Sequence, residues 1–243
     1  MKVVSRAQLL ADAADPLAAY QTGEDDICLL GEGFWATVSA ERPGLGGALV
    51  FAQKPVDADA VLAELTRLSK AKGLELCWLS AEGDFEITQE PWTRGDQWVW
   101  MWAQRVVAEG SFDFVELDDD ADAQEILDFA MPLNPLFEGM PGQGINEFWV
   151  GARDDDRLIG CGTARRTPAG YGYLAGILVD PAYRGRGLGS AIIAELSRRF
   201  LETDPVVTLS AYAKNKSAIS VYRRLGFNLA HEFSFWSTRP FVS

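Results

Sequence analysis

Cysteine and histidine are scarce in this chain of 243 residues, which has three cysteines and one histidine. Cys28, Cys77 and Cys161 are far apart in sequence, and an odd, sparse set excludes a disulfide framework and favours a reducing compartment. We expect all three to be small buried hydrophobic residues. Because clustered Cys and His ligands are absent, no metal site is expected. His231, the only histidine, is expected to be a surface or helix-capping residue.

Long apolar runs are absent as well. No stretch reaches the roughly 18 apolar residues of a membrane span, so no membrane partner is expected. Residues 1–7 lack the apolar core and cleavage pattern of a signal peptide. Together with the cysteine pattern, these features predict a cytoplasmic protein. A hydrophobic content of 48% is enough for one large core or two small ones.

Charge is unevenly distributed. The net charge of −13 argues against nucleic acid as a partner. Residues 1–110 have a net charge of −8 and residues 111–183 of −10, whereas residues 184–243 carry nine basic and four acidic residues, a net +5. The one basic segment fits a polyanionic ligand, and the acidic segment before it favours a cationic acceptor such as an amine. We expect the aspartate runs 118–120 and 154–156 to be solvated turns.

Residues 184–189, Arg-Gly-Arg-Gly-Leu-Gly, form a segment that we call the glycine loop. It lies between an apolar strand-like run, 174–179, and a helix-like run, 190–201. Bare backbone, two arginines and the free N–H groups of a helix start predict a site for phosphate or pyrophosphate. No Gly-Lys-Ser/Thr follows, and the spacing is a poor match to a dinucleotide fingerprint. A turn that only caps the helix is the alternative.

A second motif follows the next apolar run, 206–211, and its order relative to the glycine loop resembles the GNAT (Gcn5-related N-acetyltransferase) superfamily. The loop motif of that family is met by Arg184, Gly187 and Gly189. Its helix motif is met by Asn215, Ala218, Tyr222, Leu225, Gly226 and Phe227. The resemblance covers residues 111–243 and implies an α+β (mixed α/β) fold, with a mostly antiparallel central sheet flanked by helices.

The resemblance also implies the site residues. Acetyl-CoA would be the cosubstrate, with its pyrophosphate on Arg184, Gly185, Arg186, Gly187, Leu188, Gly189 and Ser190. Its pantetheine arm would pair with Ile177, Leu178 and Val179, and a backbone N–H there would polarise the thioester carbonyl. Asn215 would cap its helix or bind the pantetheine amide. Tyr222 would give a proton to the departing thiolate. The base stays open between Glu138 and Glu147, which flank the expected acceptor loop.

The implied reaction is direct transfer of an acetyl group, in a ternary complex, to a primary amine of a small molecule or peptide. A non-catalytic acyl-CoA sensor is the first alternative, and Tyr222 favours the enzyme over it. An ATP-dependent enzyme is the second, and the missing Lys-Ser/Thr disfavours it. The acceptor does not follow from the sequence, and neither does the oligomeric state, a homodimer included.

The order of elements predicts two domains, 1–110 and 111–243. In the second we expect strands near 112–117, 147–153, 158–166, 171–179, 206–211 and 232–237, and helices at 121–131, 190–201 and from Asn215 onward. The first has short matches to the second, such as residues 63–67 with 194–198. It is therefore interpreted as a smaller, degenerate GNAT-like α/β domain. Residues 53–58, which take the place of the glycine loop there, contain no glycine.

Overall fold

A computed structural model describes residues 1–107 and 112–239. The chain divides into two compact units. The first contains residues 1–99, residues 212–214 and the segment that begins at Ala230, and the second contains residues 100–211 and 215–229. The last strand of the chain is therefore part of the first unit. The predicted boundary between residues 110 and 111 lies outside the described residues.

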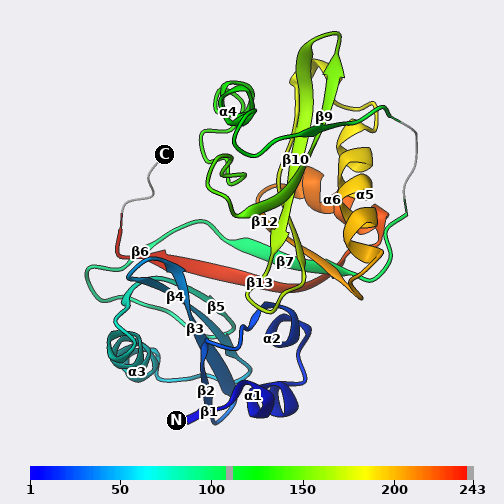
Figure 1. The fold of residues 1–243 in the computed structure, drawn as a ribbon. Helices are drawn as coiled ribbons and strands as arrows, with labels where there is room; N and C mark the ends of the chain where they lie inside the picture. The colour runs from blue at the N-terminus through cyan, green and yellow to red at the C-terminus, as the bar shows by residue number, and fades with distance from the viewer. Residues whose placement is uncertain (108–111, 240–243) are drawn as a thin grey trace. The chain divides into compact units, whose positions relative to one another are not determined.

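The first unit is a sheet with helices packed against it (Figure 1). Its strands, in sheet order, are β1 (Lys2–Val4), β2 (Ile27–Gly31), β3 (Phe34–Arg42), β4 (Leu45–Ala52), β5 (Glu75–Glu82) and β13 (Asn228–Ser237), and the short β6 (Thr93–Arg94) pairs with β13. Its helices are α1 (Arg6–Ala13), α2 (Pro16–Gln21) and α3 (Ala58–Ala71). The pairs are antiparallel except β4 with β5, which are parallel and are connected through α3.

The second unit has the same kind of architecture. Its strands, in sheet order, are β7 (Trp98–Ala103), β12 (Val207–Tyr212), β11 (Gly172–Val179), β10 (Arg157–Arg166), β9 (Asn146–Asp154) and β8 (Val115–Leu117). Its helices are α4 (Ala123–Ala130), the 3-10 helix η1 (Pro181–Tyr183), α5 (Leu188–Leu201) and α6 (Lys216–Leu225). Helices α4 and α5 lie on opposite faces of the sheet (Figure 1). The predicted mixed α/β fold with a mostly antiparallel sheet is confirmed.

The two sheets share one strand order. In the first unit β1 to β5 are neighbours in sequence order, and in the second β8 to β12 are. In each, three antiparallel pairs are followed by one parallel pair, and a helix of 14 residues connects that parallel pair. A shared order of this kind supports the interpretation of the first unit as a degenerate copy, which stays a prediction.

Close packing fixes α5 against the sheet of the second unit. Two glycines of β10 lie beneath it, and a Cβ atom added at Gly162 would stand 2.8 Å from Ile192 Cγ2 and 2.9 Å from Leu196 Cδ1. Ile192 and Leu196 are fully buried, which is worth roughly 1.5–3 kcal/mol for each such side chain. The sheet therefore determines where the first turn of α5 lies.

Cys28, Cys77 and Cys161 are free and buried, as predicted. Within the described ranges, no helix has both the length and the apolar character needed to cross a bilayer.

His231 is not the surface or capping residue expected from the sequence. It is buried in the first unit, where its Nδ1 lies 2.5 Å from Glu82 Oε2 and its Nε2 lies 3.2 Å from Asp15 Oδ1. Burial acts to lower the pKa of His231, but the hydrogen bonds and charges of the two carboxylates outweigh it and raise this pKa to about 9. The imidazolium therefore holds β13 to the end of β5 and the start of α2.

This arrangement predicts how stability depends on pH. A His pKa raised from 6.5 to about 9 on folding gives stability that is complete below pH 6.5 and is lost as the pH rises through 9. We expect the free energy of unfolding to fall by roughly 2–3 kcal/mol over that range. Denaturant titrations of a His231→Gln variant should be nearly flat there. An equal slope in variant and wild type would contradict the assignment.

Candidate active site

The glycine loop begins in a fixed conformation. Strand β11 ends at Val179, and Asp180 caps η1 by accepting a hydrogen bond from the N–H of Ala182 at 2.8 Å. Arg157 Nη1 donates to the other carboxylate oxygen, also at 2.8 Å. The Ala182 N–H and, to a lesser degree, the Arg157 guanidinium hold the pKa of Asp180 below its usual value. The carboxylate thus stays charged and anchors the chain where it enters the loop.

The three glycines of the loop have different reasons to be glycine. Gly185 (φ +76°) and Gly187 (φ +89°) adopt left-handed backbone conformations that other residues reach at a cost. Gly189 lies in α5, and a Cβ atom added there would meet only Val179 Cγ2, at 3.5 Å, an ordinary contact. Glycine in a helix costs about 1 kcal/mol relative to alanine. Neither packing nor backbone geometry requires it at position 189, so its bare surface is available to a ligand.

Helix α5 begins without a side-chain cap. Its N-cap is Gly187, and the N–H of Ala191, bonded to the Gly187 carbonyl at 3.0 Å, makes the first helical hydrogen bond. The N–H groups of residues 188–190 therefore have no helical partner and point out of the positive end of the helix. Leu188 contributes only its backbone, because its side chain is buried in the core.

Two exposed arginines stand beside these N–H groups. Arg184 Nε donates to the Val179 carbonyl at 3.0 Å, and Arg186 Nη2 donates to the Ala182 carbonyl at 3.2 Å. The Arg186 guanidinium also lies over the Tyr183 ring, at 5.1 Å from its centroid. Each arginine is held to the loop by one nitrogen and keeps further N–H donors for an anion.

The corresponding helix of the first unit cannot bind an anion in this way. Helix α3 is capped by Asp57, whose Oδ1 accepts from the N–H of Ala60 at 3.0 Å, and Asp59 adds a second carboxylate in the first turn. The cap occupies one of the free N–H groups, and the negative charge repels phosphate. The start of α3 is thus unfavourable to an anion for a local electrostatic reason.

The parallel strands β11 and β12 stop pairing partway along their length. They pair at Gly172, Tyr173 and Leu174 with Val207, Thr208 and Leu209, yet β11 continues to Val179 and β12 to Tyr212. We call this separation the fork. Beyond it, the backbone groups of Ile177, Leu178 and Val179 on the side of β12 have no partner strand among the described residues. In the first unit β4 and β5 stay paired from Leu45 to Phe51, with one shift of register between Gly46 and Gly47, so no fork forms there.

A bulge next to the fork turns the edge of β11. Between the pairs Cys161–Leu178 and Thr163–Ala175, β11 contains one residue more than β10. Gly176 absorbs this extra residue with a φ of +59°, and its added Cβ would stand 3.0 Å from Gly139 Cα. The bulge changes the direction of the N–H and C=O groups of β11 where the pantetheine arm is expected.

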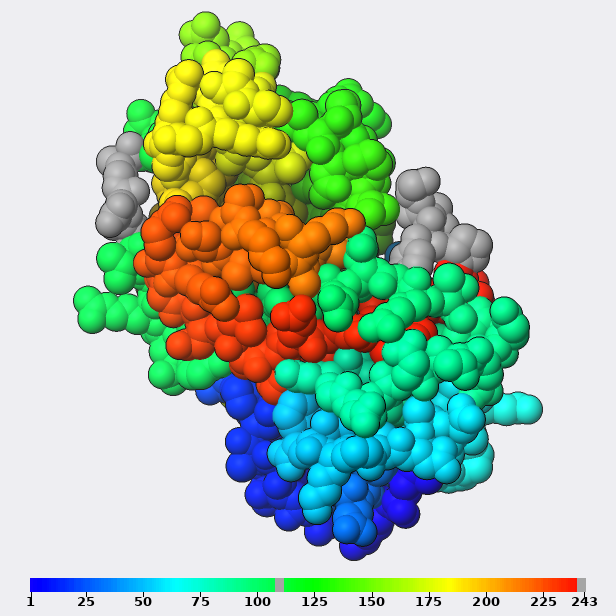
Figure 2. All heavy atoms as spheres, turned by 180° about the vertical axis from the view of Figure 1, so that it is seen from behind, coloured from blue at the N-terminus to red at the C-terminus, as the bar shows by residue number. Residues whose placement is uncertain are grey.

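Both ends of α6 are capped, and this positions Tyr222. Asn215 Oδ1 accepts from the N–H of Ala218 at 3.2 Å, so the capping role predicted for Asn215 is present. At the other end Gly226 has a φ of +106°, and the N–H of Phe227 bonds the Tyr222 carbonyl at 3.0 Å. Ile219, Tyr222 and Leu225 share the buried face of the helix. The segments that carry α5 and α6 adjoin in Figure 2 (yellow and orange).

Tyr222 lies near Tyr173, one of the three β11 residues that pair with β12 before the fork. Burial, and then the nearby Tyr173, raise the pKa of Tyr222 to about 12, so its phenol is protonated at neutral pH. The pKa of Tyr173 is also raised, mainly by burial and further by the charge of Glu138, whereas Arg165 and a side-chain hydrogen bond with Ser210 oppose the rise. These couplings bring β10, β11, β12, α6 and the loop before β9 together.

The two candidate bases are in different surroundings. Glu138 is near enough to Tyr173 to act on its pKa. Glu147 instead accepts from Arg166 Nε at 2.8 Å. The structure thus places Glu138 beside Tyr173 and commits Glu147 to an ion pair. Sequence reasoning missed Tyr173 and Arg165, although their alternation along two paired strands could have put them on one face.

The acidic runs are not only solvated turns. Asp119 accepts hydrogen bonds from Trp149 Nε1 at 2.7 Å, Asn146 Nδ2 at 2.8 Å and the N–H of Gly144 at 3.0 Å. Despite partial burial, these bonds hold the pKa of Asp119 below its usual value. Asp119 therefore fastens the end of a proline- and glycine-rich loop, residues 131–144, to β9, and this loop contains Glu138.

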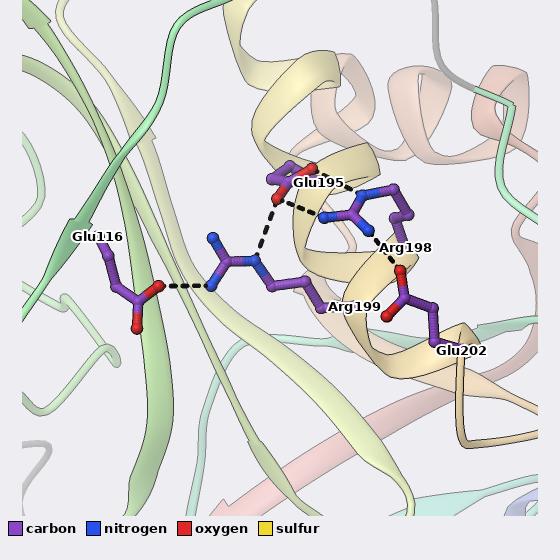
Figure 3. A network of polar contacts seen from close by, with 5 residues as sticks. All are labelled: Glu116, Glu195, Arg198, Arg199 and Glu202. Atoms are coloured by element: carbon purple, nitrogen blue, oxygen red, sulfur yellow. Dashed lines mark hydrogen bonds and ion pairs between the residues drawn. The ribbon is translucent and has the colours of Figure 1, made fainter.

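Much of the positive charge of residues 184–243 is neutralised. Figure 3 shows Arg198 held by Glu195 and Glu202, and Arg199 held by Glu195 and Glu116. A cavity of about 560 Å³ lies along this side of α5, and its lining includes neither the glycine loop nor Tyr222. The positive charge at the loop comes from Arg184 and Arg186.

Comparisons with known proteins agree with this geometry. The model of the acetyltransferase (GNAT) family matches residues 113–227. N-alpha-acetyltransferase RimI of Mycobacterium tuberculosis is 39% identical over 82 residues, which are 32% of this chain and 51% of that protein. Mycothiol acetyltransferase of Corynebacterium aurimucosum is 40% identical over 77 residues, 30% of this chain and 24% of that protein. The chain spans 22% to 51% of the length of the curated relatives that it matches.

Two solved structures share the fold over nearly the whole chain. A GCN5-related N-acetyltransferase from Kribbella flavida has a TM-score of 0.56 and 13% identity, and covers 98% of this chain and 96% of its own. A GNAT-family acetyltransferase from Colwellia psychrerythraea has a TM-score of 0.53 and 12% identity, and covers 98% and 99%. At these identities the likeness concerns the fold alone.

The matched segment contains the glycine loop, the fork and Tyr222. Residues 113–227, slightly less than half of the chain, are thus similar to the acetyltransferase (GNAT) family. This similarity supports the acyltransferase activity that is proposed below.

The cap of α6 gives a test of how Tyr222 is held. A Cβ atom at Gly226 would stand 2.8 Å from the Arg105 carbonyl oxygen, and the positive φ adds strain. We expect Gly226→Ala to lower the free energy of unfolding by about 2–3 kcal/mol. Ser220→Ala, on the exposed face of the same helix, is the control. A loss below about 0.5 kcal/mol in denaturant titrations would show that α6 does not depend on this cap.

Proposed function

We propose that the protein transfers an acetyl group from acetyl-CoA directly to a primary amine of a small molecule or peptide. The observation that carries this proposal is the fork between β11 and β12, which leads to an uncapped, glycine-lined helix start. Unpaired strand edges fit an extended amide-containing arm, and a bare N-terminus with two arginines fits a diphosphate. The two features lie on consecutive segments of one chain, from Ile177 to Ser190.

The residues of the loop would bind the pyrophosphate of acetyl-CoA through several contacts at once. One charge at a helix start gains about 0.3–1 kcal/mol. Micromolar affinity needs about 8 kcal/mol, so the N–H groups of residues 185–190, the two arginines and the edge at Ile177, Leu178 and Val179 must act together. The bound cosubstrate supplies an activated acetyl group. The part of this chain is to hold it in line with the amine.

Tyr222 acts on the leaving side as a hydrogen-bond donor. The amine nitrogen forms a bond to the acetyl carbon, the carbon–sulfur bond breaks, and the thiolate takes a proton from water as it is released. With a pKa of about 12, the Tyr222 phenol is a weaker acid than a thiol with a pKa near 8.5, so full transfer is uphill. Tyr222 therefore acts first as a hydrogen-bond donor to the developing charge on sulfur, where it stabilises the transition state.

Glu138 is the group we assign to the amine side. Its carboxylate lies near enough to Tyr173 to raise the pKa of that residue, and Tyr173 in turn acts on the pKa of Tyr222. A carboxylate there takes the proton that the amine loses as the amide forms, directly or through one water. Glu147 is excluded from this role by its bond to Arg166.

The Gly189→Ala variant distinguishes an effect on acetyl-CoA binding from an effect on folding stability. Because alanine favours a helix and meets no close neighbour there, we expect the variant to unfold at a slightly higher temperature, by up to about 1 kcal/mol of stability. The new methyl group should nevertheless weaken acetyl-CoA binding at least tenfold, since it would stand where the diphosphate approaches. Thermal shifts with acetyl-CoA, CoA, ATP and NAD provide the measurement.

Ser220→Ala is the control for this test. We expect alanine to stabilise α6 slightly there and to leave the affinity for acetyl-CoA unchanged. Unaltered acetyl-CoA affinity in Gly189→Ala would remove the loop from the binding site. Stabilisation of the wild type by ATP or NAD, and not by acetyl-CoA, would overturn the proposed cosubstrate.

Tyr222→Phe tests the chemical step. We expect kcat to fall by about 10²- to 10⁴-fold with little change in acetyl-CoA affinity, because only the donor to sulfur is lost. In the wild type the raised pKa keeps the phenol protonated to about pH 11, so the rate should rise as the amine deprotonates and should not fall below that pH. Tyr20→Phe, in the first unit, is the control. Full turnover in Tyr222→Phe would refute the assignment.

A further inference from the structure

Arg165 lies on β10 directly across from Tyr173 of β11. Its side chain is half-buried, and its guanidinium carbon lies 5.1 Å from the centre of the Tyr173 ring. Tyr173 is the middle residue of the three that pair before the fork opens. Arg165 is thus a positive charge at the closed end of the fork.

Arg165 differs from the other arginines of the sheet and of α5. Arg153 pairs with Glu125 at 2.7 Å, Arg157 with Asp180 at 2.8 Å, Arg166 with Glu147 at 2.8 Å, and Arg198 and Arg199 with glutamates at 3.0 Å (Figure 3). Arg165 has no ion pair in the part of the chain that the structure describes. A half-buried guanidinium without a counter-ion is poorly solvated, and a carboxylate matches its paired donors.

The cosubstrate pyrophosphate is too far away to be this counter-ion. Residues Tyr173 and Val179 are six positions apart on one strand, which is about 20 Å at roughly 3.3 Å per residue. The glycine loop begins beyond Val179. The anion that Arg165 binds must therefore belong to the other substrate.

The surroundings of Arg165 contain one positive and one negative side chain, as a site for a zwitterion would. Tyr173 interacts with Arg165, with Ser210 of β12 and with the charge of Glu138. One cation and one carboxylate thus act on one half-buried tyrosine, and Tyr222 lies near it. An amine that carried no other charge would leave Arg165 without a counter-ion in the complex.

We infer that the acceptor is an amine that also carries a carboxylate, such as a free amino acid, and that Arg165 binds this carboxylate. The inference rests on the proposed function. Arg165 holds the acid group while the nitrogen lies toward Glu138 and the fork. Arg165 is then a specificity-determining residue, and it takes no part in proton transfer.

The test compares acceptors that differ only in the carboxylate. The pairs are L-leucine with L-leucinamide and 4-aminobutyrate with n-butylamine, with acetyl-CoA as donor. Each rate is divided by the concentration of the unprotonated amine, so that differences in amine pKa do not enter the comparison. For wild type we expect kcat/KM to be at least 10-fold higher for the better of the two acids than for its uncharged partner. In Arg165→Gln this preference should fall by about 10- to 100-fold, through loss on the acid alone. Arg165→Lys should restore part of it.

Arg166→Gln is the matched control, because Arg166 is the next residue and is already paired with Glu147. It should leave the preference unchanged. Melting temperature and acetyl-CoA affinity of each variant report on the fold and on the first substrate, and both should equal those of wild type in Arg165→Gln.

The outcomes separate the inference from the proposed function. If wild type acetylates the uncharged amines as fast as the acids, or if Arg165→Gln slows both in equal proportion, the inference fails and the acetyltransferase proposal stands. If wild type binds acetyl-CoA but acetylates none of a broad panel of amines and peptides, the proposed function fails. A preference for acids that is lost in Arg165→Gln and retained in Arg166→Gln supports both.

Discussion

Parallel strands that stop pairing leave backbone N–H and C=O groups without partners, and such groups need another partner or water. In this protein β11 and β12 separate after Leu174 and Leu209, and the glycine loop follows at the end of β11. The bulge at Gly176, the cap of η1 and the close packing of α5 on β10 all serve to hold this edge and this loop in one geometry. A ligand with amides and a diphosphate in series would satisfy both.

The first unit shows which parts of that geometry are dispensable for the fold. It has the same strand order and a crossover helix of equal length, yet its parallel strands stay paired and its helix begins with Asp57. Both differences give backbone N–H or C=O groups of the first unit a hydrogen-bond partner within the protein. In the second unit β11 has no strand partner beyond Leu174 on the side of β12 among the described residues, and the start of α5 has no side-chain cap, so a ligand that binds there would add stability.

Much of this was predictable from the sequence, because the informative residues act locally. Glycines at 185 and 187, the cap at Asn215 and the Leu225-Gly226-Phe227 turn each impose a backbone conformation that a short motif encodes. The mixed α/β fold follows from the order of those motifs. The ends of the elements differ from prediction by a few residues, mainly at β8 and β13, where pairing decides them.

What was not predictable depends on contacts between distant segments. The sequence does not show that Arg165 meets Tyr173 or that Tyr173 lies near Tyr222, since both depend on strand register and tertiary packing. It does not separate Glu138 from Glu147 either, because the Arg166 ion pair is a tertiary contact. The burial of His231 likewise arises when residues 15, 82 and 231 meet, and a lone histidine carries no signal of that.

The membership of β13 in the first unit has a consequence for biosynthesis. Ser234 to Ser237 pair with residues 78–81 of β5, so the sheet of the first unit lacks this strand until residues 234–237 have left the ribosome. During translation, the first unit must wait with an open edge while the second unit is being synthesised. Domains usually fold in the order in which they emerge. Here the amino-terminal unit is the one completed last.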